Sequence, residues 1–231
     1  GDFDAVHRRG AENVAKAASA AGCEALVHIS AIGADRQSES RYGRSKGDGE
    51  AAVREAFPGA TILRPSIIFG REDQFVNRFA GLIKMLPIVP IIGGDAKFQP
   101  VYVGDVARAA SAALLDPARY GGQTYELGGP EQISMAALNR YIAREIGRSP
   151  AFLEMPDAAS RLMASATGWL PGAPITSDQW IMLQSDNIVG PDAKTLSAFG
   201  IDPTPMATIV PDYLVRYRKH GRFTEDKPAR A

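Results

Sequence analysis

Residues 25–46 read ALVHISAIGADRQSESRYGRSK, and this stretch decides the fold. Ala25–Ile29 is a short apolar run that ends at Ser30, which is typical of a buried parallel strand. A polar loop separates this run from a helix expected from Arg41 to Phe57, which should stop at Pro58 and Gly59. A strand, a loop and a helix in this order predict one unit of an α/β sheet.

The same alternation extends to both sides of this stretch. A helix is expected over residues 4–21, followed by Gly22, a residue that favours the position just after a helix. Downstream we expect strands and helices at residues 61–64, 73–86, 101–103, 106–115, 124–127 and 134–146, with a Pro/Gly-rich loop over 87–98. Alternating strands and helices predict an α/β fold, a doubly wound parallel sheet with helices on both faces.

From residue 148 onward the alternation gives way to short helices between prolines. They are expected at residues 157–167, 176–184, 192–199 and 206–220. The spacing of Thr176 and Gln179 is that of a capping box, which strengthens one of these starts. We therefore expect a Rossmann-like part over residues 1–128 and a smaller, mostly helical region over 129–231, with 71–98 leaning toward the smaller region.

The composition excludes several classes of protein. The 231 residues include 26 basic and 26 acidic side chains, so the chain lacks the net positive charge typical of nucleic-acid-binding proteins. Cys23 is the one cysteine, which excludes an internal disulfide framework and fits a reducing compartment. The most apolar stretch, residues 83–92, is far shorter than a membrane-spanning helix and contains prolines. The three histidines lack metal-ligand spacing, so no metal site is predicted.

Three side chains in the opening stretch predict proton-transfer chemistry. Ser30 ends the strand, and Tyr42 and Lys46 lie one turn apart on the same helix face. An ammonium near a phenol favours the phenolate and lowers the phenol pKa, so Tyr42 could exchange a proton with a substrate hydroxyl or carbonyl. The serine hydroxyl could orient the same oxygen, and the lysine could hold a cofactor ribose. Ligands of open α/β sheets bind at strand carboxyl ends, where this set is expected.

Several residues have more than one interpretation. A tyrosine four residues before a lysine is, by itself, usually an exposed helix pair. Asp105 is either a catalytic base or, as we favour, the cap of the helix that follows it. The last expected helix ends in a basic cluster, made of Arg216, Arg218, Lys219, His220 and Arg222. This cluster is either a solvated helix end or a docking surface for an acidic partner or anionic lipid.

Several motifs resemble the short-chain dehydrogenase/reductases, in their NAD-dependent epimerase/dehydratase branch. They are His28-Ile29-Ser30-Ala31, Tyr42-Gly43-Arg44-Ser45-Lys46, Leu63-Arg64-Pro65-Ser66, Phe69-Gly70, residues 101–107 and residues 125–130. The resemblance implies that Ser30, Tyr42 and Lys46 form the catalytic set. It also implies that Tyr42, Lys46, Pro65, Ser66 and Ile67 bind the nicotinamide end of NADP or NAD.

Further motifs resemble the NADPH-binding accessory subunit of respiratory complex I and its bacterial relatives. They are residues 40–42, 69–73, Phe75, residues 77–80 and 99–103, Ile175-Thr176, Leu196, Phe199-Gly200-Ile201 and Thr204-Pro205. The resemblance implies a structural or assembly role with bound cofactor and complex I subunits as partners. It further implies a cytoplasmic location, or one at the inner face of the cytoplasmic membrane by peripheral contact. The alternative is an active oxidoreductase or epimerase that acts on a small-molecule substrate with the Ser-Tyr-Lys set.

Two departures from the family pattern qualify these expectations. Ile67 stands where sugar-nucleotide epimerases usually have an asparagine, which argues against a nucleotide-sugar substrate. No glycine-rich phosphate loop is present, because the available glycines do not follow a strand and open a helix. We expect about three βα units, roughly 90 residues, to precede Gly1, so the sheet here is the C-terminal half. The fragment alone should then bind dinucleotide weakly or not at all.

Overall fold

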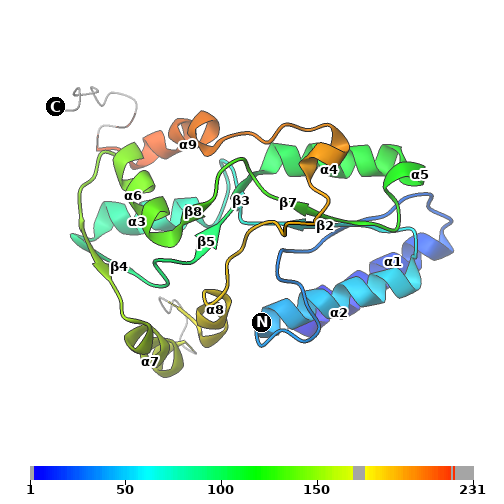
Figure 1. Cartoon of the computed structure of the whole chain (residues 1–231), viewed down its shortest axis with the longest axis horizontal. Helices are drawn as coiled ribbons and strands as arrows, with labels where there is room; N and C mark the ends of the chain where they lie inside the picture. The colour runs from blue at the N-terminus through cyan, green and yellow to red at the C-terminus, as the bar shows by residue number, and fades with distance from the viewer. Residues whose placement is uncertain (1–2, 169–174, 220, 222–231) are drawn as a thin grey trace.

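The computed structural model describes residues 3–168, 175–219 and 221. Its central sheet has the strand order β1-β2-β7, with both neighbouring pairs parallel. The strands are β1 (Val27–Ile29), β2 (Thr61–Pro65) and β7 (Thr124–Leu127). One face is covered by α1 (Ala11–Ala20) and α2 (Arg41–Ala56), the other by α4 (Val103–Leu115) and α5 (Pro117–Tyr120) (Figure 1). The predicted parallel sheet with helices on both faces is confirmed.

Apolar side chains fill the layers on both sides of this sheet. Toward α4, a core forms around Leu63, Val101, Ala109 and Leu127, all at most 1% exposed. Toward α2, a smaller core contains Ala15, Val53 and Ala60. A wide π-helical segment, η1 (Asp4–Gly10), precedes α1 and lies against α2. The chain leaves α1 through a glycine with positive φ, +67° at Gly22, as its helix-end position predicts.

A second group of elements packs at the other end of the molecule (Figure 1). Its helices are α3 (Val76–Met85), α6 (Met135–Glu145) and α9 (Met206–Leu214), which share one apolar core with the short η3 (Val215–Tyr217) at its edge. Three two-stranded sheets complete the fold: β3 (Ile68–Phe69) with β6 (Val101–Tyr102), β4 (Ile88–Ile91) with β9 (Ala151–Glu154), and β5 (Lys97–Phe98) with β8 (Ile133–Ser134).

The prediction of a loop over residues 87–98 is wrong, because this stretch contains the strands β4 and β5. In β4 the side chains of Val89 and Ile91 are buried while their neighbours face outward. Alternation of this kind is the strand pattern, but Pro87 and Pro90 disguise it. The partner β9 begins with Ala151, whose N–H donates to the Pro87 carbonyl, so a distant segment completes the pairing.

Helix ends were predicted with mixed success. Ser134 caps α6, and Thr176 with Gln179 forms the expected capping box at α8 (Ser177–Met182). The helix α7 (Asp157–Thr167) also lies where it was expected. The helix expected at 192–199 is only a short 3₁₀ turn, η2 (Leu196–Phe199), and the last helix ends at Leu214 before η3.

Asp105 is not the helix cap that we favoured. The helix begins two residues earlier, at Val103, so Asp105 lies inside its first turn. Its carboxylate is 1% exposed and accepts hydrogen bonds from the Thr204 N–H at 2.7 Å and the Thr204 hydroxyl at 2.9 Å. Arg108 donates to the same group at 2.8 Å. Asp105 therefore ties the C-terminal segment to α4.

The division of the chain near residue 129 stays a prediction. Segments after that point return to the first sheet, since Leu196 and Ile201 pack in the same core as Leu127. No described helix is both long and apolar enough to cross a lipid bilayer. Across residues 3–168, 175–219 and 221, no cluster of His, Cys, Asp or Glu side chains could hold a metal ion.

Candidate functional site

Lys46 of α2 reaches the carboxyl end of β1, where Ser30 follows the strand, and lies over the ring of Tyr42. The Ser30 N–H continues the strand ladder by donating to the Leu63 carbonyl at 2.7 Å. The Lys46 ammonium donates to the Ile29 carbonyl at 3.3 Å, next to Ser30 in the chain. The same nitrogen lies over the Tyr42 ring, 5.9 Å from its centroid. Lys46 thus links Tyr42 to the strand end that carries Ser30, and the role of the three residues as a catalytic set stays a prediction.

The Ser30 hydroxyl is buried and has no hydrogen-bond partner within the described part of the chain. The residue is only 3% exposed. Leaving a buried hydroxyl unpaired costs about 1–3 kcal/mol. A free donor and acceptor at a strand end therefore suits an incoming ligand oxygen.

Tyr42 is buried beside two aromatic rings. The rings of Phe3 and His7 meet it edge-on, at centroid distances of 5.9 Å and 5.5 Å. His7 is held in turn by Ser45, whose hydroxyl lies 2.9 Å from its Nδ1. Burial raises the pKa of Tyr42 above its ordinary value. The expected lowering by Lys46 is absent, because a phenolate among these rings would lose its hydration.

The pKa of Lys46 is lowered by burial, and the carboxylate of Glu50 opposes that shift. Glu50 lies one helical turn beyond Lys46 and is 5% exposed. It accepts two hydrogen bonds from Arg64, at 2.8 Å and 2.7 Å. Tyr42, Lys46 and Glu50 therefore form one stripe on the sheet-facing side of α2, with spacing of four residues.

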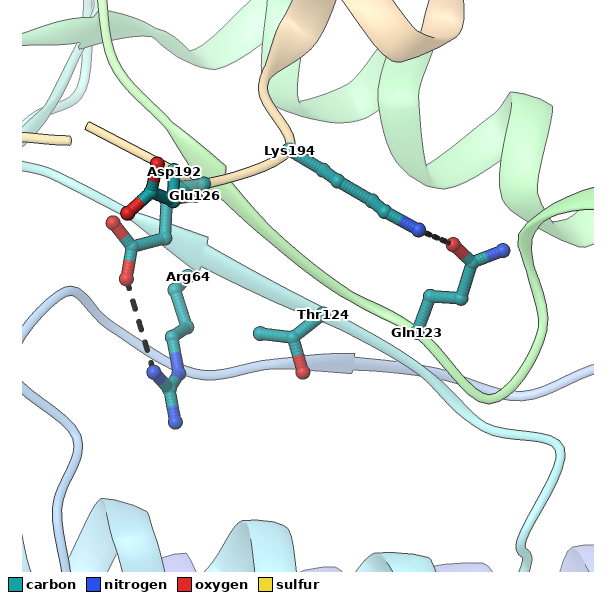
Figure 2. Close-up of a pocket in the computed structure, with 7 residues that line it drawn as sticks. Arg64, Gln123, Thr124, Glu126, Asp192 and Lys194 are labelled. Atoms are coloured by element: carbon teal, nitrogen blue, oxygen red, sulfur yellow. Dashed lines mark hydrogen bonds and ion pairs between the residues drawn. The ribbon is translucent and has the colours of Figure 1, made fainter. Parts of the chain in front are cut away.

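Arg64 also borders a polar pocket of about 370 Å³ between β2, β7 and the segment before η2 (Figure 2). Its guanidinium lies 3.8 Å from the Glu126 carboxylate. The other lining residues are Gln123, Thr124, Asp192, Ala193 and Lys194, and Lys194 bonds to Gln123. None of Ser30, Tyr42 or Lys46 lines this pocket, so it is separate from the predicted set.

The turn after β2 places Pro65, Ser66 and Ile67 beside the same strand ends. Pro65 is the last residue of β2, and its carbonyl accepts the N–H of Ile32 at 3.0 Å. The Ser66 hydroxyl bonds to Asn187, so it is already engaged within the chain. Ile67 packs against an apolar cluster near Phe98. Their predicted contact with cofactor stays a prediction.

Sequence reasoning missed two residues of the C-terminal region that reach this site. Asp178 accepts hydrogen bonds at the start of α2, and Asn187 bonds to Ser66. The capping-box spacing located the helix that carries Asp178, but its partners lie about 137 residues away in the chain. No local pattern reports a contact over that separation.

A comparison with known protein families decides where the chain belongs. The RmlD substrate binding domain matches residues 3–167, which is most of the chain. The chain belongs to the RmlD substrate binding domain family. The resemblance to the NAD-dependent epimerase/dehydratase branch of the short-chain dehydrogenase/reductases is thereby confirmed.

Curated relatives of this RmlD-family chain include two subunits of NADH dehydrogenases. It is 34% identical over 210 residues to the mitochondrial NADH dehydrogenase [ubiquinone] 1 alpha subcomplex subunit 9 of Arabidopsis thaliana, covering 87% of this chain and 52% of the relative. It is 31% identical over 222 residues to the mitochondrial NADH-ubiquinone oxidoreductase 40 kDa subunit of Neurospora crassa, covering 96% and 58%. The chain thus spans between half and six-tenths of the length of these two relatives.

Among solved structures, the NADPH-dependent quinone oxidoreductase QOR2 of Escherichia coli, complexed with NADPH, is similar in fold. The TM-score is 0.69 at 21% identity, over 88% of this chain and 70% of that one. Identity this low supports the fold only. The Rossmann-like expectation is therefore confirmed.

The residues present in this RmlD-family chain fit the nicotinamide end of a dinucleotide. Ser30 offers a buried hydroxyl that has no partner among the described residues, and the Lys46 ammonium, which has three protons, donates to the Ile29 carbonyl and can donate further. When bound, the nicotinamide would supply hydride chemistry. Ser30, Tyr42 and Lys46 would orient a neighbouring oxygen and hold a proton at the Tyr42 hydroxyl. The glycines of α2 are inside a helix and do not form a phosphate loop.

Proposed function

We propose that the chain is part of an NAD(P)-binding subunit that associates with respiratory complex I and keeps its cofactor bound for structural reasons. The observation that carries this proposal is the match to two NADH dehydrogenase subunits over 87% and 96% of the chain. The partners are complex I subunits, and the protein would lie at the inner face of the cytoplasmic membrane as a peripheral component.

The surroundings of Tyr42 favour a structural role over turnover. Burial raises its pKa, so the phenol gives up its proton less readily than a free tyrosine does. The protonated phenol can still donate a hydrogen bond to a ribose or carboxamide oxygen. A site of this kind holds a cofactor without a poised general base.

Two arginines of the basic cluster form contacts within the fold. Arg216 bonds to the Arg71 carbonyl at 3.3 Å and to Asn77. Arg218 donates to the Glu145 carbonyl at 2.8 Å. These two arginines are thus partly engaged within the fold, while His220 and Arg222 lie outside the described residues.

The test uses the full-length protein, tagged and purified from its host in mild detergent. We expect complex I subunits to copurify and acid denaturation to release NADPH. Lys46→Ala should lower the released nucleotide, whereas Lys84→Ala, at an exposed lysine of α3, should not. A protein that purifies without complex I subunits and without nucleotide would refute the proposal.

A second candidate function is an active oxidoreductase or epimerase. It is favoured by the buried Ser30 hydroxyl, which has no partner among the described residues and can orient a reacting substrate oxygen. Tyr42→Phe separates the two functions because it removes the exchangeable proton and keeps the ring. A catalyst should lose at least about a hundredfold in turnover while cofactor stays bound. Unchanged respiration with intact binding would exclude this second function.

A further inference from the structure

The first turn of α2 is capped by a carboxylate from the other end of the chain. Asp178 Oδ1 accepts the Arg41 N–H at 2.6 Å, and Oδ2 accepts the Tyr42 N–H at 3.1 Å. The Ser40 hydroxyl donates to Oδ2 at 3.1 Å while accepting the Gly43 N–H at 3.1 Å. Together Asp178 and Ser40 satisfy the first three N–H groups of α2, which a helix cannot satisfy internally.

This cap differs from ordinary ones in where it comes from. A helix is normally capped by its own preceding residue, as Ser40 also does here. Asp178 instead lies on α8, which Figure 1 shows beside the start of α2. A carboxylate at this end is also favoured by the partial positive charge of a helix N-terminus. The contact therefore links the C-terminal region to the helix that carries Tyr42 and Lys46.

The helix that carries Asp178 is itself held firmly. The capping box fixes its first turn, and the Ser177 hydroxyl donates to the Ala164 carbonyl of α7 at 3.2 Å. Asp157 of α7 accepts the Trp180 indole N–H at 2.9 Å and the Gln184 amide at 3.1 Å. The pair α7–α8 can thus serve as an anchor against which α2 is positioned.

We propose that Asp178 is a positioning residue, which ties α8 to the first turn of α2 and so sets where Tyr42 and Lys46 stand relative to Ser30. Tyr42 bears one of the bonded N–H groups, so a shift of the cap moves its ring directly. Lys46 follows one turn later on the same face. The expected effect on NADPH binding rests on the proposed function, whereas the expected effect on the positions of Tyr42 and Lys46 does not.

The test compares Asp178→Ala with Asp157→Ala in the full-length protein. Asp178→Ala removes the α8 carboxylate that bonds to α2. Asp157→Ala removes an α7 carboxylate that bonds to Trp180 and Gln184, and it leaves the capping box and the Ser177 contact that hold the first turn of α8. Site-specific 3-fluorotyrosine at position 42 should show a shifted ¹⁹F resonance in Asp178→Ala and the wild-type resonance in Asp157→Ala. Amide hydrogen exchange in a peptide covering 40–48 should accelerate about tenfold in Asp178→Ala only, which corresponds to the loss of one helix cap.

A conservative variant and cofactor binding complete the test. Asp178→Asn keeps one acceptor oxygen, so its exchange rate should lie between those of wild type and Asp178→Ala. The Kd for NADPH should rise about tenfold in Asp178→Ala. If the wild type binds no NADPH, the proposed function fails and the exchange and ¹⁹F results still decide this inference. Wild-type spectra and exchange in Asp178→Ala, or equal changes in Asp157→Ala, would overturn it.

Discussion

The hydroxyl of Ser66 points at two oxygens of Asn187, its backbone carbonyl at 2.9 Å and its side-chain Oδ1 at 2.7 Å, although 121 residues separate the two in the chain. The Asn187 amide also donates to the Ile32 carbonyl at 3.3 Å. One side chain therefore fastens the turn after β2 to the loop after β1. These are the two turns that flank the predicted nicotinamide site.

Asn187→Ala should lower the free energy of unfolding by about 1–2 kcal/mol, because two hydrogen bonds between segments are lost. Urea unfolding measures this, with Ser66→Ala and the double variant completing a cycle. The two residues share a contact, so their effects should be non-additive by at least about 0.5 kcal/mol. Strict additivity would mean that the hydroxyl does not depend on the Asn187 side chain.

Close approach of η1 to α2 depends on a missing side chain at Gly49. A Cβ at this position would lie 2.1 Å from the His7 carbonyl oxygen, so Gly49→Ala must push η1 away. We expect a loss of about 1–3 kcal/mol in stability, and the His7 ring should move from Tyr42. Thermal unfolding and the Tyr42 ¹⁹F signal would report these two effects.

Gly81→Ala is the matched control for this change. Gly81 lies inside α3, and a Cβ there meets no atom within 4 Å. Alanine is favoured over glycine in a helix interior, so stability should rise by about 0.5–1 kcal/mol. If both variants behaved alike, helix propensity rather than close packing would govern Gly49.

The sequence sufficed for the central sheet and for the main helices because their signals are local. The apolar run before Ser30, the glycine after α1 and the Ser134 cap each act within a few residues. The strand β4 was not predicted, because its prolines suggest a loop. Its pairing also depends on β9, which lies about 60 residues later in the chain. Pairing between distant segments is a tertiary property.

Local features of the candidate site were likewise predictable from the sequence. They are the spacing of Tyr42 and Lys46 on α2 and the strand that ends at Ser30. The raised pKa of Tyr42 was not predictable, because it comes from burial in the folded chain, where η1 brings His7 against the Tyr42 ring. The cap by Asp178 was likewise invisible, since a carboxylate beside a helix start carries no sign of which helix it serves. Local chemistry was predictable, whereas the surroundings that tune it were not.

Glu50→Gln should destabilise the fold by about 2–3 kcal/mol, because the Arg64 guanidinium, 26% exposed, loses its charged partner at 2.7 Å and keeps only the more distant contact to Glu126 at 3.8 Å among the described ion pairs. The variant should also lower the pKa of Lys46 further, since Glu50 opposes the effect of burial. Urea unfolding gives the first quantity, and NMR titration of a ¹³C-labelled Lys46 gives the second.

Asp48→Asn provides the comparison on the same helix. Asp48 pairs with Arg36 at 3.0 Å, but these side chains are 37% and 69% exposed. An exposed pair contributes less than about 1 kcal/mol. An equal loss in the two variants would show that the burial of Glu50 does not matter.

Tyr141 should make the protein sensitive to alkaline pH. Burial, followed by the nearby Glu145 and Glu131 carboxylates, raises its pKa to about 12. An unfolded tyrosine ionises near 10. The protonated form is favoured in the folded state, so this contribution to stability is present below about pH 10 and is lost as the pH rises through 12. The half-buried ring limits the contribution to about 1 kcal/mol.

Tyr141→Phe isolates that contribution. The buried hydroxyl has no hydrogen-bond partner among the described residues, so its removal should stabilise the protein by about 1 kcal/mol at pH 7. Between pH 9 and about 11.5, the variant should lose less stability than wild type by a similar amount. Guanidinium unfolding at each pH measures the difference. If Tyr141→Phe were destabilising at pH 7, the hydroxyl would have to be hydrogen-bonded, and its raised pKa would then reflect that bond rather than burial.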